Sequence, residues 1–242
     1  NNYALAFYAL GNVYTASKEL NNAVSSFQKA IEINPNLANA HNNLGLAFRD
    51  LNDFQSAINS YQKAVKIQPN HAGAHHNLAQ SFREVGEFEK SIKSHLMAIK
   101  YEPQNLAHHY FLSELKKDIL DTHLKDKIKK IIENNKSTFS NKAYGNYLLA
   151  RYERKAKNYE KELYYLEQGH QNFYNTRKKK FDLNNKYCFE DVLKIEKEAK
   201  INSKNKEKYI EIKPIFIFGV PRSGSTLVEK IIGSGKKFIQ VG

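Results

Sequence analysis

A loop around residue 222 combines glycines, hydroxyl side chains and an arginine in an order that can bind an oxyanion. Residues 215–218 are Ile-Phe-Ile-Phe after a proline and predict a buried parallel strand, residues 219–225 predict a tight Gly/Ser loop, and Thr226 begins an apolar helix. The first turn of such a helix has unpaired N–H groups and a partial positive charge, so it needs few further contacts to hold a phosphate or a sulfate. Arg222 can add two donors from one planar guanidinium.

The spacing Gly219-x-x-x-x-Gly224-Ser225-Thr226 is that of a Walker A loop, but Ser225 stands where that loop has its lysine. A nucleotide triphosphatase uses this lysine to bridge the terminal phosphates during transfer. The loop therefore predicts binding of a phosphate or sulfate rather than nucleotide hydrolysis. Two alternatives stay open: a P-loop kinase without its lysine, which predicts binding of ATP and Mg²⁺, and an ordinary strand-to-helix connection without a ligand.

Residues 214–232, Pro-Ile-Phe-Ile-Phe-Gly-Val-Pro-Arg-Ser-Gly-Ser-Thr-Leu-Val-Glu-Lys-Ile-Ile, resemble the 5′-phosphosulfate-binding loop of sulfotransferases. The resemblance is to the Pro-Arg-Ser-Gly-[Ser/Thr]-Thr form found in protein-tyrosine sulfotransferases and in bacterial proteins that fuse tetratricopeptide repeats to a sulfotransferase domain. It implies that 3′-phosphoadenylyl sulfate (PAPS) is the sulfonate donor. It also implies that Arg222 is catalytic, neutralising the sulfonate during transfer, and that the donor is bound by Arg222, Ser223, Gly224, Ser225 and Thr226.

By the same resemblance, the reaction would transfer a sulfonate from PAPS to a hydroxyl acceptor, with protein tyrosine as one candidate. Residues 238–241 predict the second strand of the catalytic sheet. The family's general base, a glutamate, and its 3′-phosphate site would follow Gly242. The sequence is therefore expected to be truncated shortly after the loop, and this segment alone is not expected to catalyse transfer. Neither the resemblance nor the residues predict a metal.

The elements upstream of the loop follow a period of 34 residues, which is marked by Pro35, Pro69 and Pro103. This period is typical of tetratricopeptide repeats, which are helix-turn-helix units that stack into a solenoid. We predict repeats at 4–37, 38–71 and 72–105. The prolines should close each second helix. Small residues should let the paired helices approach while aromatic rings fill the space between them, at three positions that recur as Ala23, Phe27 and Ala30, then Ala57, Tyr61 and Ala64, then Ser91, His95 and Ala98.

A repeat array of this kind presents its first helices on a concave surface that can receive a partner. Asn43 and Asn77 share the sixth position of their units and resemble the asparagine ladder of O-linked N-acetylglucosamine transferase, where amides hold the backbone of an extended peptide. The resemblance implies a peptide or protein acceptor in the groove. Exposed polar residues without a ligand remain the alternative. Further candidates on this surface are Asn12, Asn42, Arg49, His76, Gln80 and Arg83.

Beyond residue 105 the period fails. Residues 106–134 predict further helix, and a degenerate repeat resumes at residue 143, with Glu162 where a small residue would normally stand. We assign 106–200 to degenerate repeats and bridging helices, 201–211 to a linker, and 212–242 to the start of the sulfotransferase domain. The predicted fold class is mainly α: a helical solenoid followed by the first β-loop-α-β unit of a P-loop-like α/β domain.

Composition limits the function further. The net charge of +13 is concentrated after residue 105, where 29 Lys/Arg face 17 Asp/Glu, and this favours attraction of a polyanionic cofactor or an acidic peptide. The lysines are scattered along amphipathic helices, so we predict no nucleic-acid site. No apolar run reaches the length of a membrane span, and Cys188 is the only cysteine, so a cytoplasmic protein is expected.

His41, His75 and His109 are 34 residues apart, which predicts packing residues rather than a metal site. The sequence does not indicate an oligomeric state. A non-catalytic scaffold, in which the repeats bind a protein partner and the sulfotransferase domain is incomplete, is the alternative to the enzyme.

Overall fold

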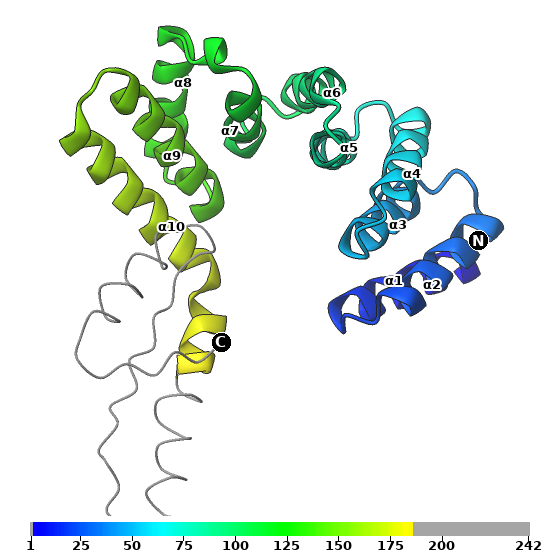
Figure 1. The fold of residues 1–242 in the computed structure, drawn as a ribbon. Helices are drawn as coiled ribbons and strands as arrows, with labels where there is room; N and C mark the ends of the chain where they lie inside the picture. Colours follow the sequence, from blue (N-terminus) through cyan, green and yellow to red (C-terminus); the bar gives the residue numbers. More distant parts are fainter. Residues whose placement is uncertain (1, 186–242) are drawn as a thin grey trace, which may run out of the picture. The chain divides into compact units, whose positions relative to one another are not determined.

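The computed structural model describes residues 2–185, and the secondary structure of this part is entirely helical (Figure 1). Chain contacts divide the polypeptide into two units, Asn1–Asn184 and Asn185–Gly242. The predicted linker at 201–211 and the predicted β-loop-α-β unit at 212–242 lie outside the described residues. The elements are α1 (Asn2–Ala16), α2 (Leu20–Ile33), α3 (Ala38–Asp50), α4 (Phe54–Ile67), α5 (Ala72–Glu84), α6 (Phe88–Tyr101), α7 (Leu106–Leu115), the 3₁₀-helix η1 (Lys117–Ile119), α8 (Thr122–Glu133), α9 (Phe139–Lys155) and α10 (Tyr159–Asn185).

The first six helices form three hairpins, α1 with α2, α3 with α4 and α5 with α6. Each second helix also packs on the first helix of the next hairpin, so α2 contacts α3, α4 contacts α5 and α6 contacts α7. This arrangement confirms the mainly α, solenoid part of the predicted fold class for the described residues. The β-loop-α-β part stays a prediction.

Each second helix ends shortly before a proline. Proline cannot continue a helix, and it disfavours helical geometry in the residue before it. The sequence therefore predicts where these helices stop, and the helices end at Ile33, Ile67 and Tyr101, two residues before Pro35, Pro69 and Pro103.

The turn inside each hairpin contains one residue with a left-handed backbone. Lys18, Asn52 and Gly86 have φ values of 64°, 62° and 79°, and they are spaced 34 residues apart. Lys157, with φ of 59°, lies in the corresponding turn between α9 and α10. A left-handed conformation costs a lysine about 1–2 kcal/mol. Because a left-handed residue also recurs in the turn at Lys157, α9 and α10 form a hairpin of the same kind as the earlier three.

In each of the first two hairpins, a ring of the second helix covers a glycine of the first helix. A Cβ atom at Gly11 would lie 2.5 Å from Cε1 of Phe27, and one at Gly45 would lie 2.6 Å from Cε1 of Tyr61. Both rings are fully buried. The absence of a side chain on the first helix therefore makes room for the ring of the second.

The third hairpin has a different pair at these positions. Ala79 replaces the glycine, and His95, whose ring is smaller than that of phenylalanine or tyrosine, is also fully buried. The hydroxyl of Ser91 donates a 2.7 Å hydrogen bond to the carbonyl oxygen of Ala79, which ties α6 to α5 beside this pair. Ala79 is larger than the glycine of the other hairpins, and the ring of His95 is correspondingly smaller than theirs.

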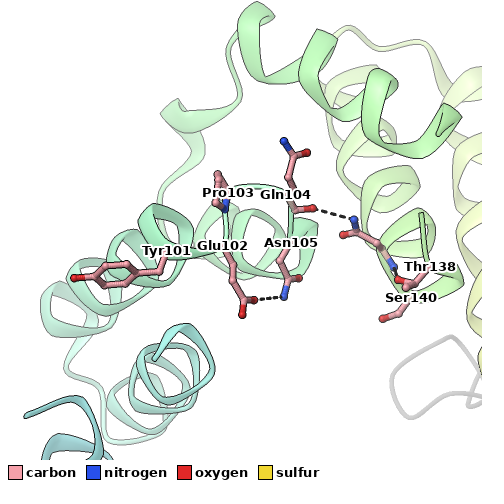
Figure 2. Close-up of a pocket in the computed structure, with 8 residues that line it drawn as sticks. Tyr101, Glu102, Pro103, Gln104, Asn105, Thr138 and Ser140 are labelled. Atoms are coloured by element: carbon pink, nitrogen blue, oxygen red, sulfur yellow. Dashed lines mark hydrogen bonds between the residues drawn. The ribbon is translucent and has the colours of Figure 1, made fainter. Parts of the chain in front are cut away.

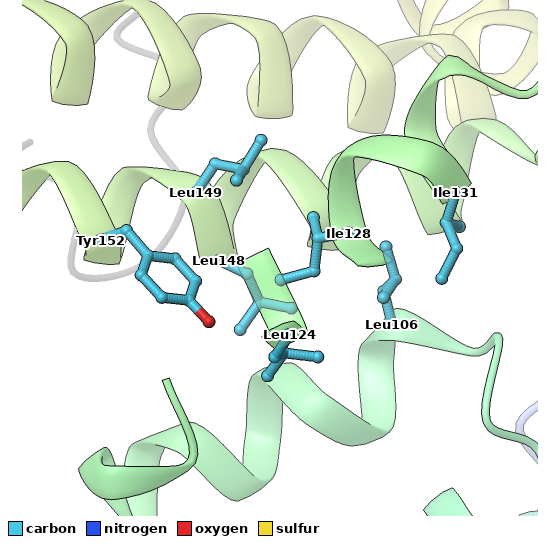
Figure 3. Close-up of a cluster of buried hydrophobic side chains, with 7 residues drawn as sticks. All are labelled: Leu106, Leu124, Ile128, Ile131, Leu148, Leu149 and Tyr152. Atoms are coloured by element: carbon cyan, nitrogen blue, oxygen red, sulfur yellow. The ribbon is translucent and has the colours of Figure 1, made fainter. Parts of the chain in front are cut away.

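The described helices after Asn105 share a larger apolar core. Leu106 of α7, three residues of α8 and three of α9 form it (Figure 3), and all of them are buried: Leu106, Leu124, Ile128, Ile131, Leu148, Leu149 and Tyr152. Gly145 of α9 lies against the α7 and α8 side chains Leu106 and Ile132. This core adds to the ring-and-glycine packing of the repeats, which recurs where the ring of Tyr147 in α9 covers Gly169 in α10.

The helix predicted over 106–134 is present but interrupted, because α7 ends at Leu115 and α8 begins at Thr122. The residue after α7, Lys116, has an extended backbone, with φ of −135° and ψ of 99°. Asp121 caps α8, its carboxylate accepting a 2.7 Å hydrogen bond from the backbone N–H of Leu124. Amphipathic periodicity continues across this break and conceals it in the sequence.

Glu162 stands where a small residue was expected, and it is 7% exposed. Its carboxylate accepts a 2.6 Å hydrogen bond from Nε of Arg154, which lies one helix earlier in the α9–α10 hairpin. A charge-assisted pair therefore stabilises a position that the repeats fill with alanine or serine.

We expect Gly45→Ala to lower the free energy of unfolding. Overpacking the contact with Tyr61 costs about 1–3 kcal/mol, and the better helix propensity of alanine offsets only about 1 kcal/mol of this. Urea denaturation followed by circular dichroism measures the change. Gly73→Ala in α5 is the matched control, because its new Cβ would meet its nearest neighbour, the His71 ring, at 3.4 Å. Equal stability of the two variants would contradict the ring-and-glycine interpretation.

Candidate functional site

The residues predicted to bind and activate PAPS lie outside the described part of the chain. These are Arg222, Ser223, Gly224, Ser225 and Thr226. The geometry that can be described belongs to the predicted peptide-binding residues on the first helices.

Asn43 and Asn77, the two predicted ladder residues, belong to one chain of side-chain hydrogen bonds that crosses α1, α3 and α5. Asn43 donates to Oδ1 of Asn12 at 2.8 Å and to the hydroxyl of Tyr8 at 3.2 Å. Asn42 donates to Oδ1 of Asn43 at 3.1 Å, and Asn77 donates to Oδ1 of Asn42 at 3.0 Å. We call Asn12, Asn42, Asn43 and Asn77 the amide row.

The members of the amide row are not equivalent. Both N–H groups of Asn43 are engaged, and its oxygen accepts from Asn42. Within the described part of the chain, the amide nitrogen of Asn12 and the amide oxygen of Asn77 make no hydrogen bond. Asn12 is exposed and Asn77 is half-buried. The row therefore offers a free donor on α1 and a free acceptor on α5, and these groups can bond to a C=O and to an N–H at different points of an extended backbone.

Charged and aromatic side chains follow the amide row on α5, α7 and α9. Glu114 accepts from Arg83 at 2.7 Å and from Arg151 at 3.1 Å, so one carboxylate joins three helices. The guanidinium of Arg151 also lies 4.2 Å from the ring centroid of Tyr110, within cation–π range. We call Arg83, Glu114, Arg151 and Tyr110 the arginine bridge.

The sequence analysis named Arg83 as a candidate but missed the other members of the bridge. Tyr110 and Glu114 occupy the places in α7 that Tyr8 and Asn12 occupy in α1, three repeat lengths earlier. Continuing the 34-residue count past residue 105 would have found both. Arg151 stands two repeat lengths after Arg83, but this count misleads, because the turn residue Lys157 shows that α9 is shifted by three residues against the repeats.

The recurring histidines connect helices to turns. His41 Nε2 lies 3.0 Å from the carbonyl oxygen of Pro35, and His75 Nε2 lies 2.8 Å from that of Pro69. Each imidazole thus pairs with a carbonyl of the turn before its own helix, which explains why this position repeats with the prolines. In residues 2–185, no group of three potential ligands has the arrangement of a metal site.

A second group of histidines lies between the third hairpin and α7. The rings of His76 and His95 have centroids 5.4 Å apart, and Nδ1 of His108 lies 3.2 Å from Nδ1 of His76. Neither ring nitrogen of His95 has a hydrogen-bond partner. Burial lowers the pKa of His76 to about 4, with a smaller contribution from His108, and burial lowers the pKa of His95 to about 3, with a contribution from His76.

A polar cavity of about 560 Å³ lies where α9 meets the loop between α6 and α7 (Figure 2). Its amides are largely engaged by the fold itself. Asn141 accepts from the backbone N–H of Leu106 at 2.7 Å and donates to the carbonyl oxygen of Gln104 at 2.9 Å, while Asn105 donates to Glu102 at 3.0 Å. These bonds connect α9 to the start of α7. The polar groups that line the cavity therefore stabilise the fold.

Three family models match the N-terminal part of the chain. A TPR repeat model matches residues 11–50, and tetratricopeptide repeat models match residues 38–71 and 60–93. The chain contains tetratricopeptide repeats. The match at 38–71 coincides with the second repeat predicted from the prolines. No curated protein sequence matches the chain.

Two solved structures illustrate what the repeats are similar to. The first TPR of Spaghetti (RPAP3), bound to the HSP90 peptide SRMEEVD, has 18% sequence identity, and the match covers 50% of this chain and 95% of that one with a TM-score of 0.47. The Arabidopsis OM64 TPR domain has 24% identity, and the match covers 48% of this chain and 97% of that one, again with a TM-score of 0.47. Of the helices described for this chain, none has the length and apolar character needed to cross a membrane.

We expect the tetratricopeptide fold to lose stability in mild acid. The lowered pKa values of His76 and His95 mean that the unfolded chain binds more protons below pH 6.5 than the folded chain does. Stability that is present above pH 6.5 should therefore fall as the pH drops toward 4, by at most about 1.4 kcal/mol per pH unit for each histidine. Urea denaturation at several pH values between 7.5 and 5 measures this slope.

The double variant Ala79→Gly/His95→Phe copies the Gly11–Phe27 pair and removes one titrating group, so its slope should be shallower. The exposed His123 provides the control, because His123→Gln should keep the slope of the unmodified protein. A slope that the double variant leaves unchanged would exclude His95 as a source of the pH dependence.

Proposed function

We propose that the tetratricopeptide repeats bind an extended segment of another polypeptide along the face formed by the amide row and the arginine bridge. The observation that carries this proposal is the free donor of Asn12 and the free acceptor of Asn77 at the two ends of the amide row. The bonds between the amides hold the row in place, so little side-chain freedom is lost when a peptide binds.

The amide row and the arginine bridge would contact different parts of the bound peptide. Amides bond to the peptide units of any sequence, so the amide row favours an extended backbone without selecting side chains. The guanidinium groups and the ring of the arginine bridge, together with the adjacent ring of Phe111, would contact side chains instead, through stacking and cation–π interactions. Specificity is therefore expected to come from α7 and α9, and affinity for the backbone from α1, α3 and α5.

Selection of unstructured twelve-residue peptides from a displayed random library tests this function. We expect the peptides enriched on the unmodified protein to bind Asn77→Leu about 10-fold more weakly, because one hydrogen bond is worth roughly 1 kcal/mol or slightly more. Fluorescence anisotropy with labelled peptides measures the loss. Lys63→Gln on α4 is the control and should bind as the unmodified protein does. Failure to enrich any peptide, or equal binding by both variants, would contradict the proposal.

For residues 214–232 we propose a second function, binding of PAPS, on the strength of the Pro-Arg-Ser-Gly-Ser-Thr string after an apolar strand pattern. Arg222 and the loop amides would stabilise charge on the sulfonate and on the bridging phosphate oxygen, which is electrostatic catalysis of the oxyanion type. The hydroxyl acceptor must lose a proton to a base. The repeats would then present the acceptor, with a tyrosine-bearing peptide as one candidate.

Calorimetric titration with 3′-phosphoadenosine 5′-phosphate checks the second function without requiring turnover. We expect binding that Arg222→Gln abolishes, because the guanidinium is the only charged side chain within the Gly219-to-Thr226 loop. Arg177→Gln serves as the control for loss of one positive charge elsewhere. If ATP with Mg²⁺ binds and 3′-phosphoadenosine 5′-phosphate does not, the kinase alternative is favoured. Absence of heat from either ligand would leave the scaffold function alone.

A further inference from the structure

Three histidines meet where α7 packs on the third hairpin, at positions that hold other residues in the earlier repeats. The centroid of the His76 ring lies 5.4 Å from that of His95 and 5.0 Å from that of His108. One repeat length earlier, the corresponding residues are Asn42, Tyr61 and Ala74. Those residues have no side chain that ordinarily titrates between pH 4 and 8. We call His76, His95 and His108 the histidine junction.

The hydrogen bonds of the histidine junction determine which ring nitrogens carry protons. A hydrogen bond from Asn105 lowers the pKa of Glu102, so this carboxylate is ionised and can only accept. Nε2 of His108, 3.2 Å away, must therefore carry the proton of the neutral imidazole and donate it to Glu102. Nδ1 of His108 then accepts from Nδ1 of His76, also at 3.2 Å. One N–H group thus connects α5 to α7.

Full protonation of the histidine junction would break this connection. If the imidazoles of His76 and His108 are both charged, two N–H groups face each other across 3.2 Å and neither nitrogen can accept. His95 adds to the effect, because it is fully buried and neither of its ring nitrogens has a hydrogen-bond partner. A charge on this ring would be desolvated without compensation. Added protons therefore favour the separation of α7 from the third hairpin.

The cations and histidines that face the junction oppose its protonation. Burial lowers the pKa of His76 most, and the charges of His108, Arg49 and Arg83 lower it further. Arg49 approaches from α3 and Arg83 from α5. The remaining histidines nearby are His71 before α5 and His109 in α7, and burial is also the main cause of their lowered pKa values. None of these groups supplies a negative charge.

Glu102, in the loop between α6 and α7, is the carboxylate that faces the junction. Its side chain is 52% exposed, so water screens its charge, and it already accepts from both Asn105 and His108. Burial lowers the pKa of His108 more than the carboxylate raises it. The negative charge therefore fixes the position of one proton but does not compensate for two or three more.

We propose that the histidine junction is a pH-sensitive contact, and that its protonation in mild acid separates α7 from the third hairpin and divides the peptide-binding face. The inference rests on the proposed function for its consequence. Arg83 and Glu114, which form a 2.7 Å ion pair in the arginine bridge, belong to α5 and α7 on opposite sides of the junction. A peptide that contacts both the amide row and the arginine bridge would then be released.

Nitrogen-15 spectra of the histidine rings test the arrangement without a ligand. In the full chain labelled at histidine, two-bond ¹H–¹⁵N correlations at pH 7.5 should show His108 protonated at Nε2 and His76 protonated at Nδ1. Comparison with His76→Asn and His108→Asn identifies the two sets of signals. A proton at Nδ1 of His108 at this pH would overturn the proposal, because that nitrogen could not accept from His76.

Fluorescence anisotropy with the peptides enriched for the proposed function measures the release. We expect binding at least about 10-fold weaker at pH 5 than at pH 7.5, because each histidine that gains a proton contributes up to about 10-fold per pH unit. His108→Asn should lose less affinity over this range, since Oδ1 of the asparagine can still accept from His76 but cannot be protonated. His123→Asn, at an exposed position, is the matched control and should lose as much as the unmodified protein.

Three results of this titration would contradict the proposal. One is equal affinity at both pH values, and another is an equal loss in His108→Asn and the unmodified protein. The third is a loss of affinity that coincides with a loss of helical circular dichroism, which would indicate unfolding of the whole chain. If no peptide is enriched, the proposed function fails, and a measurement without peptide decides the fate of the junction.

That measurement is the distance between two spin labels on opposite sides of the junction. Lys93→Cys in α6 and Lys130→Cys in α8 provide exposed attachment sites, and Cys188→Ser removes the native thiol. We expect a narrow distance distribution at pH 7.5 and a longer or broader one at pH 5. Adding His108→Asn should reduce this change. A distribution that is the same at both pH values would overturn the pH-sensitive contact, whatever the peptides show.

Discussion

The contact of a buried ring with a glycine backbone sets the geometry of the solenoid. Phe27 covers Gly11 and Tyr61 covers Gly45, and in each case the missing Cβ lets the two helices of a hairpin approach. The contact recurs one repeat later, and successive first helices, α1 with α3 and α3 with α5, lie in contact. Side chains 31 or 35 residues apart can then meet, as Asn43 meets Asn12 and Asn77 meets Asn42. The amide row is a consequence of packing that takes place on the opposite side of the same helices.

The third hairpin shows how far this packing can change. Ala79 adds a methyl group where the glycine stood, and His95 removes ring volume in compensation. The exchange keeps the helices together but leaves two imidazole nitrogens without partners. A buried polar group without a hydrogen bond is costly, and the cost falls where the repeats give way to the core of α7, α8 and α9. The third hairpin, whose Ala79 and His95 depart from the repeat pattern, therefore adjoins the part of the chain in which α7, α8 and α9 share one core.

Much of the helical part could be predicted because its determinants are local and periodic. Proline positions fix where second helices end, and alternation of small and aromatic residues identifies the contacts between paired helices. The break at Lys116 to Asp121 could not be predicted in this way, because the apolar pattern of α7 and α8 runs on through it. Only the capping bond that the N–H of Leu124 donates to Asp121 and the shared core with α9 decide that the chain turns there.

The sequence could predict where the residues of the candidate site lie, but not which of their amide groups form hydrogen bonds. Counting repeats places Asn43 and Asn77 on one face, yet it cannot tell that Asn43 donates both its N–H groups to neighbours while the oxygen of Asn77 stays free. Those bonds depend on side chains from three helices. Arg151 was missed for a related reason, since its place on this face follows from the packing of α9 and not from the period.

The distribution of charge along the face limits what its C-terminal end can bind. Glu114 already accepts from both Arg83 and Arg151, so an incoming carboxylate would have to displace a carboxylate held at 2.7 and 3.1 Å. The rings at this end have no such competitor: Tyr110 of the bridge and its neighbour Phe111 are half-buried, and each presents part of its surface. Apolar and aromatic side chains gain contact there without breaking an ion pair. The arginines consequently act on this face more as supports that orient the rings than as anion receptors, and selectivity for side chains follows from shape and stacking.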